Sequence, residues 1–511
     1  MSNPKLYLFA IGGTGSRVLS SLAMLLATGV KVNAEKIIPM IIDTDINNGD
    51  VEKCRNIIRN YNEIHKAAYK GVNNDENLGH FFRTEILPPK ELNISGNDYG
   101  TLKEMISYDT LSSQGFSKTK GLFDLCYSND NKNMPLEKGF LGNPNVGSVV
   151  LKNVVESKIF KEFTQDFGQN DRIFVISSIF GGTGAAGFPL LLNVFRDENT
   201  NLNNGSYINN AVIGGVSVLP YFQVDVEKFN NGESAINSST FITKTKAALS
   251  YYNRNLRNLV NTLYFVGDTS HSNYENFDGG IDQKNPSNII EMIAASAVLD
   301  FIGFDSKSGT KDELAEQHNY FEYGINTNSS NVDLNQLKND EFKKKILQFH
   351  YFNAYVSNFM ENSLKDEHLA WRNELNLPNN FHNDHFFKNL KKFTTQHYYR
   401  WLFENASDNH NRKFHPFDLS IIINGDEISK DNQGNLEVRT QIDDKKLFTL
   451  VNGISAKDSS NIFKKDKINF NEEFSKIAKS IVSQQHGNAE RATMNMLNIG
   501  TQKIIEDRFV L

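Results

Sequence analysis

The sequence of 511 residues is poor in cysteine and has no long apolar run. Its only cysteines, Cys54 and Cys126, lie far apart and are not spaced as metal ligands, which argues against a disulfide scaffold and suits a reducing compartment. No apolar run approaches the length of a membrane span, and the amino terminus lacks a basic segment followed by an apolar core and a cleavage site. We therefore expect a cytoplasmic protein without a membrane span.

An excess of basic charge is also missing. The chain has 54 basic and 60 acidic residues and a formal net charge of -6, which argues against a general nucleic-acid binder. Its length allows two or three domains with a sizeable core.

Two common nucleotide motifs are absent or incomplete. The P-loop pattern G-x-x-x-x-G-K-[ST] does not occur, which argues against a P-loop NTPase. Gly182, Gly184 and Gly187 do fit G-x-G-x-x-G, but a dinucleotide site also needs an acid at the end of the next strand, roughly 20 residues on. The next expected strand, 211–222, ends in Pro220-Tyr221-Phe222 and has no such acid.

The central stretch 173–189, IFVISSIFGGTGAAGFP, is the most informative part of the chain. Its β-branched and aromatic residues predict a buried strand, followed by a glycine-rich turn and an apolar helix. Glycines let backbone N–H groups approach a phosphate, and the helix that follows directs its partial positive end to the same place. The expected phosphate contacts are Gly181, Gly182, Thr183 and Gly184.

A second unit of the same kind opens the chain. The apolar segment 5–10 predicts a strand, and residues 18–28 predict a helix. Between them lies another glycine turn, with Gly12, Gly13, Thr14 and Gly15.

The next expected strand, 36–42, ends in Asp43, Thr44 and Asp45. Carboxylates at the carboxyl end of a parallel strand lie on the ligand side of the sheet, where they hold a ribose, a magnesium ion or a metal-bound water. The alternative is a capped turn that leads into a helix containing residues 51–58. Further on, Gly142 and Asn143 precede an expected helix over 149–163. These two residues either reach a terminal phosphate or form an ordinary loop.

The sequence also predicts a division of the chain. Residues 1–305 carry the alternating strands and helices of an α/β domain, closed by a buried helix over 286–303. Residues 306–511 are richer in charged and aromatic helices, such as 340–364, 384–405, 470–483 and 489–508, with possible strands at 419–423 and 447–451. We expect a mostly helical carboxyl-terminal domain with a small sheet.

Taken in order, these segments resemble the tubulin/FtsZ superfamily, in particular its divergent bacterial tubulin-like group. The family signature Gly-Gly-Gly-Thr-Gly-[Ser/Thr]-Gly is matched by residues 180–186, with departures at Phe180, Ala185 and Ala186. FtsZ has Asn-Thr-Asp after its second strand, where this chain has residues 43–45. The other matching segments are Gly12-Gly13-Thr14-Gly15, Gly142-Asn143-Pro144 with Gly147, and Leu219-Pro220-Tyr221-Phe222.

The resemblance implies a Rossmann-type parallel sheet with helices on both faces, and a site for GTP or GDP with Mg²⁺. It implies that residues 12–15 and 181–184 surround the phosphates, and that residues 43–45 and 142–143 lie near the terminal phosphate and its metal. In relatives, the start of the central helix holds the guanine base. Glu291 is the first candidate here because a carboxylate accepts from two guanine N–H groups, and Asn288 is the second. The alternative is that both residues cap the helix.

Relatives also complete their active site between head-to-tail subunits, with two acids three residues apart on a loop after the central helix. Glu313 and Glu316 have this spacing, although such pairs are common on solvated helices. Asp305 and Asp333 are further candidates. The resemblance therefore implies a GTPase that depends on self-assembly.

Two alternatives stay open. One is a nucleotide-dependent scaffold or switch with little hydrolysis, which binds a protein partner through its carboxyl-terminal domain. The other is an NAD(P)-dependent oxidoreductase that uses the amino-terminal turn with Asp43 or Asp45.

Overall fold

The computed structural model describes most of the chain. The described ranges are 4–45, 47–69, 71, 80–92, 100–112, 116–140, 142–224, 240–268, 272–274, 280–303, 319–324, 329–419, 428–430, 436–438, 447, 450–457, 468–482 and 488–511.

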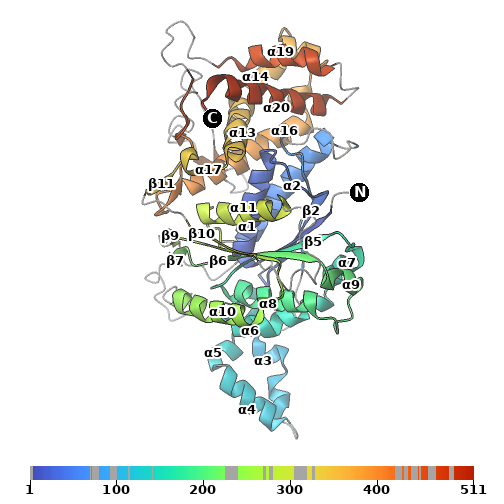
Figure 1. Cartoon of the computed structure of the whole chain (residues 1–511), viewed down its shortest axis with the longest axis vertical. Helices are drawn as coiled ribbons and strands as arrows, with labels where there is room; N and C mark the ends of the chain where they lie inside the picture. Colours follow the sequence, from blue (N-terminus) through green and yellow to red (C-terminus); the bar gives the residue numbers. More distant parts are fainter. Residues whose placement is uncertain are drawn as a thin grey trace.

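A parallel sheet forms the centre of the molecule (Figure 1). Its strand order is β10-β8-β6-β5-β1-β2-β3, and β4 also pairs with β2. All of these pairs are parallel, so the carboxyl ends of the strands lie at one edge of the sheet. The strands are β1 (Leu6–Ile11), β2 (Lys36–Ile42), β3 (Glu85–Ile86), β4 (Lys90–Glu91), β5 (Arg172–Ser178), β6 (Val212–Val218), β8 (Thr262–Gly267) and β10 (Asn319–Gly324).

The central strands are largely apolar because both of their faces are covered. All residues of β1 and β5 are buried, as expected for strands between two layers of helices. The two strands are neighbours, with Leu6 opposite Arg172 and Ala10 opposite Ile176. The predicted α/β sheet is therefore confirmed, and the expected strand over 36–42 has the observed bounds of β2.

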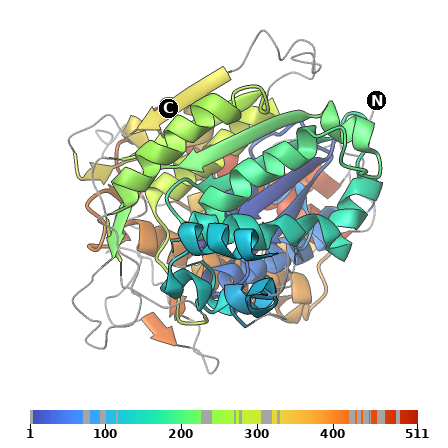
Figure 2. The ribbon, with the colours of Figure 1, turned by 90° about the horizontal axis from the view of Figure 1, so that it is seen from below.

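Helices cover both faces of the sheet (Figure 1). One layer contains α1 (Gly12–Ala27), α2 (Gly49–Tyr69) and α11 (Ile289–Gly303). The other layer, seen from below in Figure 2, contains α6 (Pro144–Val150), α7 (Lys158–Asp166), α8 (Gly182–Arg196), α9 (Gly205–Asn209) and α10 (Phe241–Asn255). The predicted central helix over 286–303 is α11, but it begins at Ile289, so Pro286 lies before the helix and not in its first turn. It is apolar on nearly all sides because it is enclosed between α1 and the sheet.

The prediction of one continuous helix over 149–163 is wrong. The segment is divided into α6, a 3-10 helix (Leu151–Glu156) and α7. The side chain of Ser157 accepts a hydrogen bond from the backbone N–H of Phe160 at 3.2 Å, so a new helix begins there.

A short helical arm projects from the lower end of the molecule (Figure 1). It contains α3 (Leu102–Met105), a 3-10 helix (Tyr108–Ser112), α4 (Ser117–Cys126), α5 (Asn129–Lys132) and a second 3-10 helix (Leu136–Lys138). No residue of α4 is buried. The arm leads directly into the Gly142 turn.

The carboxyl-terminal helices pack above the α2 layer (Figure 1). They are α13 (Asp340–Asn358), α14 (Met360–Lys365), α15 (Ala370–Glu374), α16 (His385–Lys392), α17 (Tyr399–Asn405), α19 (Phe470–Val482) and α20 (Ala489–Arg508), with 3-10 helices at Leu334–Gln336 and Phe381–Asn383 and a π-helix at Phe393–Tyr398. Short strand pairs complete the fold: β7 (Phe222–Val224) with β9 (Ser272–Tyr274), β11 (Asn331–Val332) with β12 (Lys413–Phe414), and β13 (Ile428–Lys430) with β14 (Leu436–Val438).

The two predicted domains are in close contact. The Trp401 indole N–H donates to Ser21 Oγ at 3.2 Å, and β10, which follows the predicted boundary at 305, pairs with β8 of the main sheet. The boundary itself stays a prediction. Of the expected strands, residues 420–423 and 448–449 lie outside the described residues, and among the described ones Val451 forms an isolated β-bridge with Phe417. Among the described residues, no helix is long and apolar enough to cross a membrane.

Candidate functional site

The amino-terminal ends of two helices meet at the carboxyl edge of the sheet. Helix α1 starts directly after β1, and α8 starts three residues after the neighbouring strand β5. A Cβ added to Gly12 would lie 3.5 Å from Thr183 Cβ, so the two glycine turns are in contact. No side chain of the described residues caps either helix, so their first N–H groups are available to a ligand.

Several of these glycines are required by close packing. A Cβ on Gly15 would lie 2.7 Å from the carbonyl carbon of Ala10, and one on Gly184 would lie 2.7 Å from the backbone oxygen of Ser178. Each helix therefore returns tightly over the end of its own strand. Gly12 has a φ of +71°, a left-handed conformation that favours glycine.

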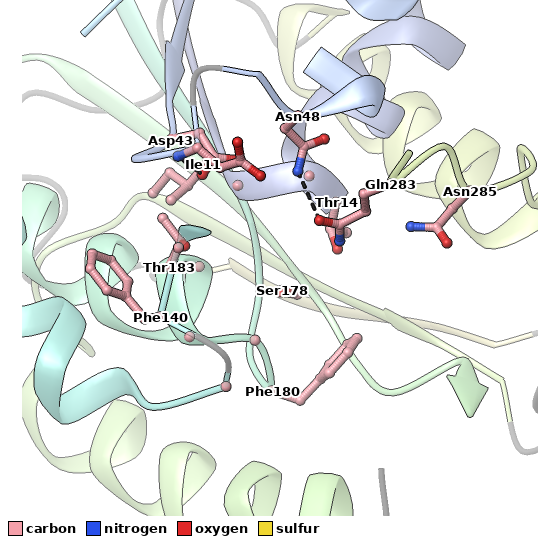
Figure 3. A pocket seen from close by; sticks show the side chains of 18 of the residues that line it. Ile11, Thr14, Asp43, Asn48, Phe140, Ser178, Phe180, Thr183, Gln283 and Asn285 are labelled. Atoms are coloured by element: carbon pink, nitrogen blue, oxygen red, sulfur yellow. Dashed lines mark hydrogen bonds between the residues drawn. The ribbon is translucent and has the colours of Figure 1, made fainter. Parts of the chain in front are cut away.

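A cavity with about 960 Å³ of free space, its open mouth included, lies between the two turns (Figure 3). The predicted residues that line it are Gly12, Gly13, Thr14, Asp43, Asp45, Gly142, Gly181, Gly182, Thr183 and Gly184. Gly15, Thr44, Asn143, Asn288 and Glu291, which were also predicted, are not among its lining residues in the described part of the chain.

The Gly142 turn closes the cavity from a third side. A Cβ on Gly182 would lie 3.0 Å from the backbone nitrogen of Gly142 and 3.2 Å from that of Asn143. Lys244 of α10 donates from Nζ to the Gly142 carbonyl at 2.7 Å. The Asn143 side chain instead donates to the Phe140 carbonyl at 3.2 Å. The structure thus brings together the three turns that are far apart in the sequence.

Two carboxylates from the end of β2 face the same space. Asp45 accepts a hydrogen bond from the backbone N–H of Gly280 at 2.6 Å. Asp43 accepts one from the backbone N–H of Asp45 at 3.1 Å. Burial raises the pKa of Asp43 to about 7, and the nearby Asp45 and Asp50 add to this effect. Thr44 lies between the two acids but is buried away from the cavity.

The carboxylates of Asp43 and Asp45 suit a cation that is also coordinated by a bound ligand. A buried aspartate with a raised pKa is stabilised in its charged form by a nearby cation. Among the described residues, no cluster of three or more His, Cys, Asp or Glu side chains could bind a metal ion alone. Mg²⁺ commonly takes one or two protein carboxylates and completes its shell with phosphate oxygens and waters. Asp43 and Asp45 fit that arrangement.

Glu291, the first candidate for base recognition, is fully buried and bonded to protein groups. Its Oε1 accepts from Arg17 Nε at 2.6 Å and from the Tyr221 hydroxyl at 2.6 Å. Its Oε2 accepts from the backbone N–H of Asn288 at 3.1 Å. Asn288 in turn accepts from the backbone N–H of Ile290 at 3.0 Å, which is a capping role.

Arg17, which also lines the cavity, joins four elements of the chain. Its Nη1 donates to Asp50 Oδ2 at 2.5 Å, and its Nη2 donates to the Tyr221 hydroxyl at 2.9 Å and to Thr14 Oγ1 at 3.2 Å. Burial alone would lower the pKa of Arg17, but Tyr221, Asp50 and Glu291 raise it well above its ordinary value. This charged cluster fixes the start of α1, and Thr14 with it.

Sequence reasoning missed the side chains at the far end of the cavity. In Figure 3, Gln283 and Asn285 lie on the opposite side from Thr183 and Phe140. Asn48 Nδ2 donates to Gln283 Oε1 at 3.1 Å. The available signal was a pair of amide side chains just before Pro286, at the start of the central helix.

Aromatic side chains also line the cavity. They are Phe180, Phe222 and Phe241. The ring centroid of Phe180 lies 5.4 Å from that of Phe222 and 4.8 Å from that of Phe241. Phe180 is one of the departures from the family signature. The cavity therefore combines glycine turns with aromatic and amide side chains, which suits an anion joined to a flat ring.

The predicted catalytic acids Glu313 and Glu316, and also Asp305, lie outside the described residues. Asp333 is described, and its Oδ1 accepts from the backbone N–H of Asn335 at 2.8 Å as the cap of a 3-10 helix. It does not line the cavity.

No protein-family model and no curated protein matches the chain. Three similar solved structures are CetZ2 from Haloferax volcanii as a GTPγS-bound protofilament (12% identity, 62% of this chain and 64% of that chain, TM-score 0.30), CetZ from Methanosaeta thermophila (15%, 61% and 58%, 0.30) and an empty FtsZ dimer from M. jannaschii (15%, 60% and 56%, 0.27). The similarity spans less than two thirds of each of these proteins. At such TM-scores the likeness alone carries no functional conclusion, which rests instead on the sheet and the cavity.

Proposed function

We propose that this chain is a cytoplasmic, bacterial tubulin-like protein that binds GTP or GDP with Mg²⁺ between its two glycine turns. The observation that carries the proposal is the meeting of two uncapped helix ends, at Gly12 and Gly182, on one cavity. Two such ends direct N–H groups and partial positive charge at the same point, which favours a chain of phosphates.

In this proposal the backbone N–H groups of both turns hold the phosphates, and Thr14 and Thr183 add hydroxyl donors. Gly142 approaches the terminal phosphate from the third side, positioned by Lys244. Asp43 and Asp45 hold Mg²⁺, which when bound neutralises phosphate charge.

The aromatic end takes the base. Phe180 and its neighbours supply a flat apolar wall, and the amides of Gln283 and Asn285 supply donors and acceptors. The assignment of Glu291 and Asn288 to the base stays a prediction, and two substitutions distinguish it from the assignment to Gln283 and Asn285. If Glu291 is structural, Glu291→Gln lowers stability and leaves the preference for GTP over ATP unchanged, whereas Asn285→Ala reduces that preference. The reverse result would return the base contact to Glu291.

Copurified nucleotide, identified by mass, is the direct test of the ligand. GTP or GDP in the native protein supports the proposal, and equilibrium titration with both nucleotides gives their affinities. NAD(P) in that position would favour an oxidoreductase instead. Protein that binds none of these at millimolar concentration would overturn the proposal.

We further propose that hydrolysis to GDP and phosphate depends on head-to-tail self-association. A neighbouring subunit's Glu313 and Glu316 would then orient the attacking water. The rate per subunit should fall on dilution, and a double Glu313→Gln/Glu316→Gln variant should lose turnover while it keeps GTP binding. A rate per subunit that does not change on dilution excludes an active site shared between subunits. Tight GTP binding without turnover favours the scaffold or switch function. The departures from the family signature at Phe180, Ala185 and Ala186 also favour that function.

A further inference from the structure

Helix α4 of the projecting arm carries an exposed apolar face. None of the ten residues of α4 is buried. Leu122 and Leu125 are 62% and 84% exposed, and Phe116, which precedes the helix, is 54% exposed. The two leucines are three residues apart, so they lie on the same face of the helix. The arm places this leucine face at the end of the molecule farthest from the carboxyl-terminal helices (Figure 1).

The other face of α4 holds the arm together. The rings of Phe123 and Tyr127 stack, with 4.4 Å between their centroids. Asp124 Oδ1 accepts a hydrogen bond from the Tyr108 hydroxyl at 2.5 Å. The Tyr127 hydroxyl donates to the Asn145 carbonyl at 3.2 Å, which ties the arm to α6. The arm is therefore braced through these side chains, and the leucine face is left for contacts outside the chain.

Charges of opposite sign flank the leucine face. Lys118 lies one turn before Leu122, and Asp130 follows Leu125 at the start of α5. Both charged side chains are exposed, and within the described part of the chain neither forms an ion pair or a hydrogen bond. The order along the arm is thus basic, apolar and acidic. Such an order is self-complementary, because an antiparallel copy sets the basic end against the acidic end and leucine against leucine.

The size of the leucine face indicates a weak contact. A helix of ten residues is about 15 Å long, whereas each partner of a stable complex buries about 800 Å². A single pair of α4 helices falls well short of that area. The contact therefore becomes significant where the local concentration of the chain is high, as it is within an assembly.

We propose that the leucine face of α4 binds the same face of a second copy of this chain, in antiparallel orientation. Leu122 then packs on Leu125 of the partner subunit, and Lys118 faces Asp130 of the partner subunit. This contact is isologous and closes on two copies, whereas a head-to-tail contact is heterologous and continues. It lies on the arm and not at the glycine turns, so it does not rest on nucleotide binding.

Cys126, at the end of α4, supplies the probe. It is exposed, whereas Cys54, the only other cysteine of the chain, is buried. A short bismaleimide joins two copies only where two Cys126 thiols come close together, so head-to-tail contacts do not contribute to the product. We expect cross-linked dimer to increase with the concentration of the full-length protein, with or without GTP. The absence of such a dimer at any concentration would overturn the proposal.

A Leu122→Gln/Leu125→Gln double variant tests the apolar contact. We expect it to weaken pairing by about tenfold or more, measured as the protein concentration that gives half-maximal cross-linking. Ile499→Gln/Val510→Gln removes two exposed apolar side chains near the carboxyl terminus and should cross-link as the unchanged protein does. A monofunctional maleimide checks that the thiol reacts equally in all variants, and circular dichroism checks that they are folded. Equal cross-linking in the two double variants would contradict the proposal.

An exchange of charges tests whether the partner is the same chain. Lys118→Asp and Asp130→Lys should each weaken pairing about threefold or more at low ionic strength, because each variant sets like charges against one another. Lys118→Asp/Asp130→Lys restores the opposite charges in an antiparallel pair and should restore cross-linking. If the leucines are needed but the exchange restores nothing, the two copies do not pair in this way and the proposal is wrong.

Discussion

One methyl group at Gly182 should be enough to close the phosphate turn. An added Cβ would lie 2.9 Å from Phe140 Cβ and 3.0 Å from the Gly142 backbone nitrogen, and backbone on that side has little room to move. We expect Gly182→Ala to weaken nucleotide binding by at least about tenfold, which is about 1.4 kcal/mol. Equilibrium titration with GTP measures the loss.

Gly121→Ala is the matched control, because an added Cβ there meets no atom within 4 Å and Gly121 lies inside helix α4. That variant should bind nucleotide normally and gain slightly in stability, since alanine favours a helix over glycine. Unchanged affinity in Gly182→Ala would show that the turn does not hold the phosphates.

Asp43 should make the ligand-free protein sensitive to pH. Because its pKa is raised from 3.8 to about 7 in the folded protein, its contribution to stability is fully present below pH 3.8 and is lost as the pH rises through 7. The slope approaches about 1.4 kcal/mol per pH unit within that window. We expect Asp43→Asn to lack this loss. The free energy of unfolding of the variant, measured in urea without nucleotide or divalent cation, should therefore rise relative to that of the unchanged protein from pH 5 to pH 8.

The exposed Asp507 provides the comparison. Asp507→Asn should follow the unchanged protein across the same pH range. An Asp43→Asn variant whose stability stays parallel to that of the unchanged protein would mean that Asp43 is already ionised without a cation.

Single residues of the site could be predicted from the sequence where they belong to a local pattern. The glycines and Asp43 could be found because strand ends and turns carry a local signal. Arg17, Gln283 and Asn285 could not be found in this way. Their roles depend on side chains that arrive from elements more than 30 residues away, such as Asp50 and Glu291, and no local spacing reports such partners.

Helix α10 contacts the Gly142 turn of the cavity through Lys244. Lys244 Nζ donates to the Gly142 carbonyl, and burial lowers the pKa of this lysine. Lys244→Met keeps the apolar stem and removes the charged donor. A hydrogen bond from a charged group contributes about 1.5–3 kcal/mol, so we expect GTP affinity to fall about tenfold or more.

The loss should be smaller for GDP, because the Gly142 turn is assigned to the terminal phosphate. Lys246→Met, an exposed substitution on the same helix, should bind both nucleotides normally. Equal losses for GTP and GDP would remove the Gly142 turn from the terminal phosphate and leave Lys244 with a structural role only.

The elements themselves were largely predictable, and the errors have physical causes. The expected helix over 489–508 has the observed bounds of α20, because its pattern and its cap at Asn488 agree. The start of α1 was placed six residues late. Glycine disfavours helix interiors, but here the glycine turn itself forms the first helical turn, held by packing against Ala10.

At the scale of the molecule, the order of strands and helices gave the parallel sheet, but the attachment of the carboxyl-terminal domain was not foreseen. That attachment depends on groups far apart in the chain. The clearest is Glu404 of α17, whose Oε2 accepts from the backbone N–H and the hydroxyl of Ser287 at 2.9 and 2.8 Å. The segment before Ser287 carries Gln283 and Asn285, so the carboxyl-terminal helices hold the part of the cavity that we propose for the base.

Loss of the Glu404 charge should therefore affect both stability and nucleotide binding. Burial alone would raise the pKa of Glu404, but Lys53 and Arg400 hold it at about 2, so its contribution is present above about pH 4.5 and is lost as the pH falls toward 2. Glu404→Gln leaves Lys53 and Arg400 without their charged partner. We expect a loss of about 3–5 kcal/mol in urea unfolding at pH 7.

We also expect weaker GTP binding in Glu404→Gln at temperatures where the variant is fully folded, because the segment that carries the base contacts loses its anchor. The exposed Glu367→Gln should change neither quantity. A variant that loses stability but binds GTP as tightly as the unchanged protein would show that the anchor only joins the domains. If affinity falls as well, the carboxyl-terminal domain is part of the nucleotide site, and any partner that moves α17 would alter nucleotide binding.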